Sequence, residues 1–367
     1  MKKKILFILN TYQFMLNSVN KSFSINKNYK IFNNEDKAWT NYFYNNLKKD
    51  YYVKKEYPYL NKHLLGRKNY LVFLEKKINK FKPDIIFSSI GDYNVEKIIG
   101  KFKKIKKIIW ISYNLDKSKI LKLKKNYNFL MSDNQLILKL AKEKNFPTFK
   151  LLISNENLIN LNIKNYYSRK EKLYFAGSLG NDFTYRLENL LFLKKNYNLK
   201  LRLRNLVERY KVLNILNSIL LSILPNFTKY LFENKILPIS NELKLINEHE
   251  VFGKTMLNEL KKYRFCINIH SDFDRNNTIN SRVFEALACG CLLFTDKNKF
   301  MSKVFKNDKH VVYFNSKNDL KKKIDYYLLN TRAAYKIAKN GNQLLIKKHQ
   351  SKIRIKEFKK ILKSIKV

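Results

Sequence analysis

Short apolar segments alternate with lysine-rich segments of helical spacing along most of this 367-residue chain. Brief apolar runs bounded by turn-forming residues are typical of fully buried strands. Parallel strands need a crossover connection, and the helical segments between the apolar runs supply one each time. The alternation therefore predicts an α/β protein built from βαβ units and parallel sheets.

The pattern occurs twice, and a chain of this length is too long for one ordinary core. The first half predicts strands at Lys4–Leu9, Ile85–Ser88, Lys107–Ile111 and Phe129–Met131. The second half predicts strands at Lys172–Ala176, Leu199–Leu203, Phe265–His270, Cys291–Thr295 and His310–Phe314. We expect two Rossmann-like domains facing a cleft, at residues 1–160 and 168–348, with a helical insertion at about 205–250. Residues 349–367 predict a C-terminal helix that crosses back.

The chain is strongly cationic, with 75 Lys+Arg against 29 Asp+Glu and a formal net charge of +46. Such a field attracts nucleic acid, anionic lipid surfaces or phosphorylated substrates. The lysines are scattered, which equally fits a bias toward Lys, Asn, Ile, Tyr and Phe in the composition. The 24 Tyr and 26 Phe residues keep a nucleic-acid-binding protein as an alternative, although no compact basic and aromatic module appears. We expect no specific nucleic-acid partner.

Cys266, Cys289 and Cys291 have neither a disulfide framework nor metal-ligand spacing, so a reducing compartment is expected. The apolar run near the start is too short for a signal peptide, and no run approaches a membrane span. The Leu/Ile-rich part of the insertion, Val212–Leu231, is either a helix on the core or an amphipathic helix at a bilayer. We expect a cytoplasmic protein that is peripheral at the inner face of the plasma membrane.

The segment Asn280–Asp296 reads as a loop, a helix that ends at Gly290, and a strand. Asn280 or Ser281 is placed to cap the helix, whose free N–H groups favour an anion. Arg282 offers bidentate bonds to a diphosphate, and Glu285 offers a carboxylate to ribose hydroxyls. An ordinary amphipathic helix with two solvated charges would show the same spacing.

This segment, NSRVFEALACGCLLFTD, resembles the donor-binding block of the group 1 glycosyltransferase superfamily, particularly its spore-maturation (CgeB-like) branch. Upstream, LYFAGSLGNDFTYR resembles the strand, Gly-Ser loop and helix of that branch, which implies donor contacts for Gly177, Ser178 and Arg186. His349 and Arg354 keep the spacing of its terminal His…Arg element. The resemblance implies the GT-B fold, with the donor diphosphate at the helix start and the ribose at the glutamate.

The resemblance also implies a hexosyltransferase-type enzyme that moves a sugar from a nucleotide-diphosphate donor to an envelope glycan, a lipid-linked acceptor or a protein. His270 ends a predicted strand and is either a ligand of the donor phosphate or a histidine with a structural bond. Asp272 and Asp274 match an Asp-x-Asp metal motif, but their place in a GT-B pattern favours a metal-independent enzyme without a cofactor.

A catalytic base for inversion is expected from the loops of the first domain. Asp116 follows the strand that contains Trp110, and Asp92 follows the strand Ile85–Ser88, so both are candidates. A surface carboxylate is the ordinary alternative for each. A catalytically inactive scaffold of the same fold is a further alternative, against which the retained Arg282 and Glu285 argue.

Overall fold

The computed structural model describes residues 2–9, 38–89, 92–112, 115–152, 154, 159–178, 184–204, 243, 246–248, 251, 253–270 and 277–365. The chain divides into two compact units, each described here by itself. The first comprises residues 1–156, 277–279 and 348–367, and the second comprises residues 157–276 and 280–347. Each holds one six-stranded parallel sheet, which confirms the predicted α/β class with two Rossmann-like sheets.

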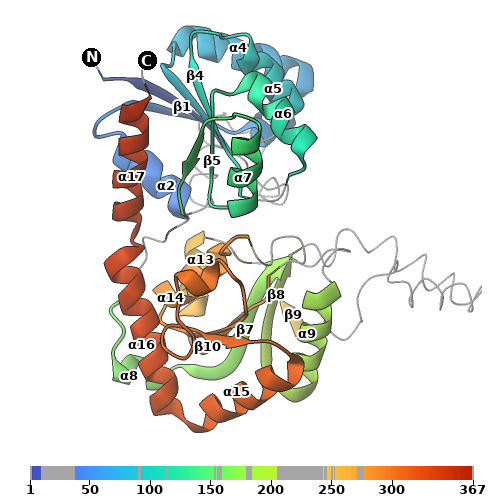
Figure 1. Ribbon diagram of the computed structural model, residues 1–367, viewed down its shortest axis with the longest axis vertical. Coiled ribbons are helices and arrows are strands. Elements are labelled where there is room, and N and C mark those ends of the chain that lie inside the picture. The colour runs from blue at the N-terminus through green and yellow to red at the C-terminus, as the bar shows by residue number, and fades with distance from the viewer. Residues whose placement is uncertain are drawn as a thin grey trace, which may run out of the picture. The chain divides into compact units, whose positions relative to one another are not determined.

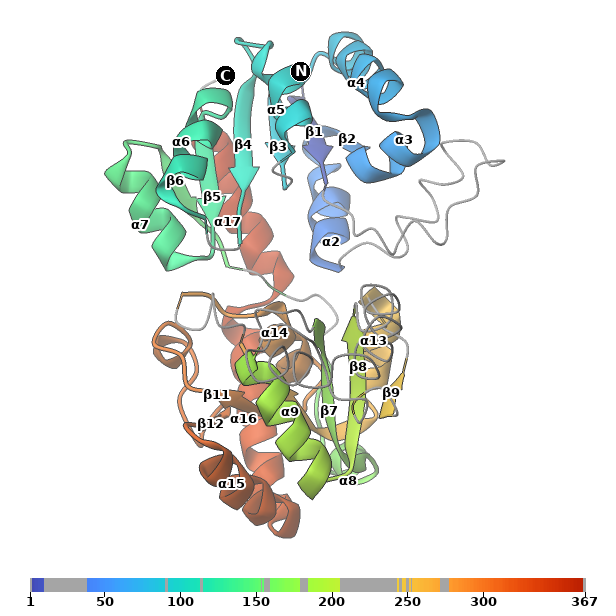
Figure 2. The same ribbon diagram turned by 90° about the vertical axis from the view of Figure 1, so that its right-hand side faces the viewer.

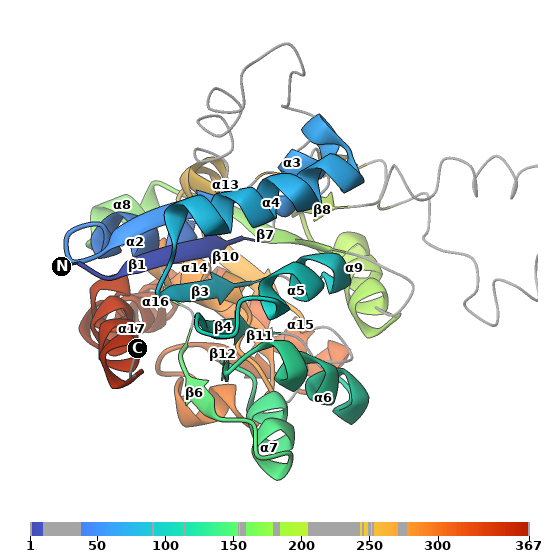
Figure 3. The ribbon, with the colours of Figure 1, turned by 90° about the horizontal axis from the view of Figure 1, so that it is seen from above.

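The sheet of the first unit has the order β2-β1-β3-β4-β5-β6. Its strands are β1 (Lys4–Ile8), β2 (Tyr52–Glu56), β3 (Ile85–Ser88), β4 (Lys106–Trp110), β5 (Phe129–Ser132) and β6 (Thr148–Lys150). Its helices are α2 (Ala38–Leu47), α3 (Pro58–Leu65), α4 (Arg67–Phe81), α5 (Tyr93–Gly100), α6 (Lys117–Asn126) and α7 (Gln135–Glu143). Apolar residues of α4 to α7 cover one face, and residues of α2 and α17 cover the other (Figure 3). Both faces are therefore buried, which explains strands that are apolar throughout.

The C-terminal helix α17 (Ser351–Ser364) belongs to the first unit and lies beside α2 (Figure 1). The Phe358 ring lies 5.3 Å from that of Phe43, 5.4 Å from that of Phe87 and 6.4 Å from that of Phe7, centroid to centroid. Burial of this aromatic cluster holds the helix against the sheet. The predicted return of the C-terminal helix is confirmed.

The sheet of the second unit has the order β12-β11-β10-β7-β8-β9. Its strands are β7 (Lys170–Ser178), β8 (Leu199–Arg204), β9 (Asn247–Glu248), β10 (Tyr263–Asn268), β11 (Leu292–Asp296) and β12 (Val312–Phe314). Its helices are α8 (Ile163–Tyr167), α9 (Thr184–Asn196), α13 (Gly253–Leu260), α14 (Ser281–Ala288), α15 (Lys317–Leu329) and α16 (Thr331–Lys348), and a 3₁₀ turn spans Met301–Lys303. Buried residues of α9, α15 and α16 pack on one face of this sheet (Figure 2).

Gly290 ends α14 at a φ of +68°, as the sequence predicts. This backbone conformation favours glycine, and a Cβ there would lie 2.8 Å from Leu161 Cδ1. Cys289 and Cys291 are fully buried free thiols on either side of it. Burial raises the pKa of Cys291 to about 11, so this thiol is inert at neutral pH. Residues 205–242 of the predicted insertion, with Val212–Leu231, lie outside the described residues, and the end of its predicted range contains the short strand β9.

Candidate functional site

The strand order of the second unit has a point at which the direction of the connections reverses. From β7 the chain continues to β8 and β9 on one side, and β10, β11 and β12 lie on the other. Connections leave β7 and β10 in opposite directions, which makes this pair a topological switch point. Open parallel sheets bind ligands outside the carboxyl ends of such a pair. A ligand-binding site is therefore expected at the residues that end β7 and follow β10.

Arg186 bridges the two strand ends at this switch point. Its Nη1 donates to the Ser178 carbonyl at 2.6 Å, and its Nε and Nη2 donate to the Ile269 carbonyl at 3.0 and 2.7 Å. The residue is 7% exposed, and its guanidinium lies 5.9 Å from the centroid of the Phe175 ring. Arg186 thus braces the end of β7 against the residue after β10. Donor contact by Arg186 stays a prediction.

Gly177 and Ser178 are the last two residues of β7, although the sequence indicated that the strand ends before them. They pair in parallel register with Leu203 and Arg204 of β8. A Cβ on Gly177 would lie 3.1 Å from the Phe175 ring, so the missing side chain leaves room for that ring. The structure thereby supplies a packing reason for this glycine. Residues 179–183, including Gly180, lie outside the described part of the chain.

The first turn of α14 follows β10 in the chain. It carries backbone N–H groups that have no hydrogen-bond acceptor among the described residues. Asn280 is the N-cap residue, but its side chain makes no capping bond, contrary to the sequence expectation. Its Nδ2 donates instead to Asn268 Oδ1 at 3.2 Å. The N–H groups of Ser281 and Arg282 have no acceptor among the described residues, and Ser281 is exposed. This helix start is therefore open to an anion.

Arg282 and Glu285 form an ion pair of 2.9 Å between Nη1 and Oε2. Arg282 Nε also donates to the Ala176 carbonyl of β7 at 3.1 Å, and Nη1 donates to Met256 Sδ. Glu285 is the fifth residue of α14 and lies beyond its first turn, so the helix dipole acts on it weakly. Arg282 Nη2 and Glu285 Oε1 have no hydrogen bond or ion pair to any described residue, and the side chains are 15% and 22% exposed. One nitrogen and one oxygen of the pair are therefore left for a ligand.

His270 follows β10 and is held by Asp296 at the end of the neighbouring β11. Asp296 Oδ1 accepts the backbone N–H of His270 at 3.0 Å and lies 2.7 Å from its ring Nδ1. Both side chains are fully buried. Asn268 Nδ2 lies 3.4 Å from the same ring nitrogen and donates more closely, at 3.0 Å, to Thr295 Oγ1.

The ring orientation of His270 follows from these distances. The near carboxylate oxygen makes Nδ1 the protonated nitrogen and directs Nε2 away from Asp296. His270 Nε2 is buried and has no hydrogen-bond partner among the described residues. A buried ring nitrogen without a partner is costly unless a ligand or water serves it. Asn268 links this ring to Asn280 at the open start of α14.

The two carboxylates expected as catalytic bases both cap helices in the first unit. Asp92 accepts from the amides of Asn94 and Val95 at the start of α5 and pairs with Lys62. Burial raises the pKa of Asp92, but the Lys62 bond and the two amides outweigh it and lower the pKa.

Asp116 caps α6 through Lys119 N and is bonded by Ser118 Oγ. Those bonds lower its pKa to about 2.

Glu96, in the first turn of α5, is a further candidate base that the sequence did not indicate. It is 7% exposed, and burial together with the nearby charge of Asp92 raises its pKa. A raised carboxyl pKa is what a general base near neutral pH requires. The signal in the sequence is only a glutamate four residues after an N-cap aspartate, which many helices show.

Among the described residues no group of His, Cys, Asp and Glu has metal-site geometry. Asp272 and Asp274 lie outside the described residues, so a metal site at the Asp-x-Asp motif remains the alternative to a metal-independent enzyme. Within the described ranges, no helix combines the length and apolarity needed to cross a membrane.

Residues 233–360, which include α13, α14 and the strands β10 to β12, match the family model described as glycosyl transferase-like. The solved structure of Anabaena Alr3699/HepE in complex with UDP-glucose is similar over 99% of this chain and 100% of its own, with a TM-score of 0.62 at 9% identity. This is the GT-B fold.

Two further solved structures share the fold over almost their whole length. Sucrose-phosphate synthase from Thermosynechococcus elongatus matches with a TM-score of 0.62 at 9% identity, covering 99% of each chain. A glycosyltransferase from Rickettsia africae matches with a TM-score of 0.56 at 14% identity, covering 99% of this chain and 98% of its own. No curated protein matches the sequence. The predicted GT-B architecture is confirmed.

Proposed function

We propose that this chain is a glycosyltransferase that takes its sugar from a nucleotide-diphosphate donor bound to the second unit. The observation that carries the proposal is the conjunction at the β7/β10 switch point. There an open helix start, a buried histidine nitrogen without a partner, and an Arg–Glu pair with free atoms follow one another in sequence and structure. Each of these features offers one of the contacts that a nucleotide diphosphate requires.

The diphosphate is assigned to the start of α14 and to His270. The amides of Ser281 and Arg282 supply donors and the positive end of the helix dipole. In this assignment the imidazole ring carries both protons, with Nδ1–H on Asp296 Oδ1 and Nε2–H donating to a phosphate oxygen. Arg282 is the second residue after the N-cap, and its Nη2 adds a fixed positive charge. These donors replace the charge that a divalent ion would otherwise supply.

The ribose is assigned to Glu285. Its Oε2 lies in an ion pair with Arg282, which orients the carboxylate before the ligand arrives, and neither oxygen has a hydrogen bond to a described residue, so the carboxylate can accept from hydroxyl groups. An acceptor group that is already positioned loses little conformational freedom on binding.

In the reaction, the bond between the sugar C1 and the diphosphate oxygen breaks, and C1 bonds to the acceptor oxygen. The departing diphosphate keeps the electron pair, so its negative charge grows in the transition state. Helix amides and His270 Nε2–H then bind it more strongly than in the ground state, which is how such donors accelerate transfer. The acceptor hydroxyl loses its proton to a base. We assign this role to a carboxylate of the first unit, with Glu96, Asp92 and Asp116 as the candidates.

The class of donor and of acceptor is assigned from the comparisons and from the sequence. The Anabaena structure holds UDP-glucose, which favours a UDP-hexose here. The sequence blocks quoted above favour the spore-maturation branch of group 1, and hence an envelope glycan, a lipid-linked acceptor or a protein as the acceptor. The net charge of +46 favours work at the inner, anionic face of a membrane, where each basic residue near the surface adds about 1 kcal/mol.

The test is a thermal-shift screen of the full chain against UDP-, GDP-, CMP- and dTDP-sugars, with and without EDTA. A donor at about 100 times its Kd should stabilise the protein by about 2.7 kcal/mol, and EDTA should not change this. Transfer activity that EDTA abolishes and Mn²⁺ restores would overturn the metal-independent site and favour Asp272 and Asp274. The absence of a shift with all four donors would contradict the proposed function.

A further inference from the structure

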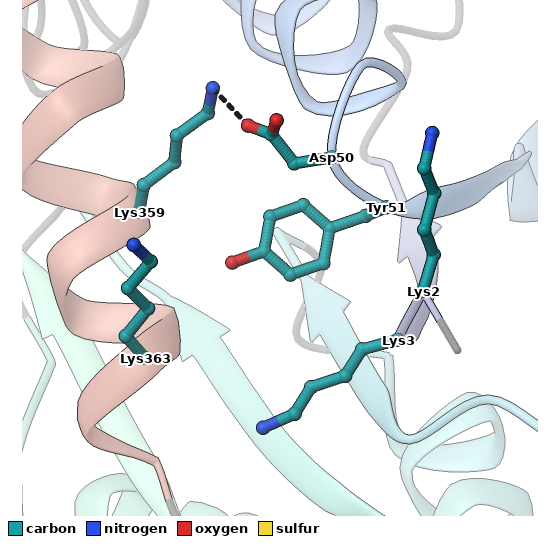
Figure 4. A pocket seen from close by; sticks show the side chains of 6 residues that line it. All are labelled: Lys2, Lys3, Asp50, Tyr51, Lys359 and Lys363. Carbon is teal, nitrogen blue, oxygen red and sulfur yellow. Dashed lines mark ion pairs between the residues drawn. The ribbon is translucent and has the colours of Figure 1, made fainter.

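A pocket of about 670 Å³ lies in the first unit, at the amino ends of its parallel strands. Its walls are Lys2 and Lys3 before β1, Asp50 and Tyr51 before β2, and Lys359 and Lys363 on α17 (Figure 4). The candidate carboxylates of the same unit follow the carboxyl ends of the strands, where parallel sheets bind substrates. This pocket therefore lies at the opposite end of the strands from them.

Four lysines and one carboxylate line this pocket. Lys359 forms an ion pair with Asp50, and Lys2 Nζ donates to the Lys49 carbonyl at 2.9 Å. The ammonium groups of Lys3 and Lys363 have no hydrogen bond or ion pair to any described residue. The Lys359 bond, with the charges of Lys359, Lys2 and Lys363, lowers the pKa of Asp50, so it stays ionised and still balances only one lysine. Like charges gathered in a recess repel one another unless an anion joins them.

Tyr51 adds a neutral donor to the pocket. Its ring packs in the cluster beneath the sheet, and the residue is 9% exposed. Burial and the charge of Asp50 both raise the pKa of its hydroxyl, which therefore keeps its proton at neutral pH. Figure 4 shows this hydroxyl pointing toward α17, near Lys363. Lysine ammonium groups and a hydroxyl are together suited to the oxygens of a phosphate group.

The surface around the pocket continues the same charge. Lys356 and Lys360 are exposed on α17 and, with Lys363, recur at helical spacing along one side of it. Lys48 and Lys49 are exposed on the turn after α2, and the Tyr52 side chain beside them is 60% exposed. Basic residues with an exposed tyrosine are typical of surfaces that lie on anionic lipid, where tyrosine sits at the headgroup level.

We propose that this lysine pocket binds the phosphate group of an anionic phospholipid and so seats the first unit on a membrane. The proposal does not depend on the donor site in the second unit, and its test measures binding alone. The proposed occupant is a phosphodiester headgroup. Its phosphate would enter the pocket, and the exposed lysines of α17 and of the turn after α2 would contact neighbouring headgroups.

The experiment is co-sedimentation of the full chain with vesicles of phosphatidylcholine, alone or mixed with phosphatidylglycerol, at fixed ionic strength. The double variant Lys3→Gln/Lys363→Gln should bind the anionic vesicles about 25-fold more weakly, at about 5-fold for each lysine. The matched control is Lys122→Gln/Lys125→Gln, which removes two exposed lysines of α6 and the same net charge. The control should lose little. Asp50→Asn removes the one negative wall and should strengthen binding several-fold.

Equal losses in the two double variants would mean diffuse attraction by the whole surface and would overturn the pocket. Wild-type binding in Lys3→Gln/Lys363→Gln would do the same. A parallel thermal-shift titration with inorganic phosphate distinguishes the sources of the anion. Stabilisation by phosphate that requires Lys3 and Lys363, without vesicle binding, would assign the pocket to a soluble phosphate compound and overturn the lipid. Circular dichroism of each variant confirms that its fold is retained.

Discussion

His270 Nδ1 and Asp296 Oδ1 lie 2.7 Å apart at the carboxyl ends of two neighbouring strands, β10 and β11, and both side chains are fully buried. The parallel register pairs Asn268 with Thr295, so the residues that end these strands are brought side by side by the sheet itself. A histidine oriented by a carboxylate through one nitrogen and free at the other is a recurrent way to present a ring nitrogen to a reacting group.

We expect Asp296→Asn to act on transfer through His270. Loss of a charge-assisted bond at the departing diphosphate should lower kcat about 10- to 150-fold in His270→Gln, by about 1.5 to 3 kcal/mol. Asp296→Asn should lower it by a similar or smaller factor. A double-mutant cycle on kcat checks the connection: the double variant should lose no more than His270→Gln alone. Independent, additive losses would show that Asp296 is only a structural residue.

Glu285→Gln is expected to weaken donor binding about 10- to 150-fold, because the bonds from the ribose lose their charge assistance at about 1.5 to 3 kcal/mol. Folding should change by no more than about 1 kcal/mol, the usual value of a partly exposed ion pair. The control is Glu188→Gln, which breaks a more exposed ion pair, with Lys317 at 3.1 Å, on the surface of the same unit. Calorimetric titration with the best donor compares the two. Wild-type affinity in Glu285→Gln would make this glutamate part of the scaffold.

Among the three carboxylates of the first unit, we expect Glu96→Gln to lower kcat most, by about 10²- to 10⁴-fold, as for a lost general base. Its pKa is raised by burial and by Asp92, whereas the pKa of Asp116 is lowered to about 2 by its capping bonds. Asp116→Asn should therefore leave kcat within a few-fold. Steady-state kinetics of these variants and of Asp92→Asn decides the assignment. A larger loss in Asp116→Asn would return the role to the residue first expected from sequence.

His349 makes the stability of the first unit depend on pH. Burial, followed by the charges of Arg354 and Lys348, lowers its pKa from 6.5 to about 4, and Arg354 Nη2 lies 2.8 Å from its Nδ1. Between these pH values the unfolded chain binds a proton that the folded chain does not, so stability falls as pH decreases from about 6.5 to about 4. At about 1.4 kcal/mol per pKa unit, the full effect is roughly 3 kcal/mol.

His349→Gln removes the titrating group and retains an acceptor for Arg354. Urea unfolding at pH 7.5, 6 and 5 should show a smaller decline in the variant than in the wild type. Parallel pH curves for the two proteins would contradict this assignment.

Much of the fold follows from the order of residues alone. Strands such as β1, β3 and β11 are continuous apolar runs, since both faces of a parallel sheet are covered, and that demand leaves a direct trace in the sequence. Three of the four edge strands, β2, β6 and β9, were missed, whereas β12 was predicted at His310–Phe314. β2 reads YVKKE, and β9 has only two residues, because an edge position tolerates lysine and needs few paired groups. α6, KSKILKLKKN, was missed because its polar composition hides its two buried positions, Ile120 and Leu123.

The candidate site divides in the same way. The segment Asn280–Asp296 indicated a ligand-binding helix start from its own residues, since a helix, its glycine stop and the next strand are local features. The sequence did not indicate which residues its side chains contact. Arg282 bonds to Ala176, 106 residues earlier, and Arg186 to the carbonyl of Ile269, 83 residues later. His270 finds its carboxylate 26 residues away. Sequence determined which chemical groups are present at the strand ends, whereas strand order and register decided which of them meet, because those depend on packing between distant segments.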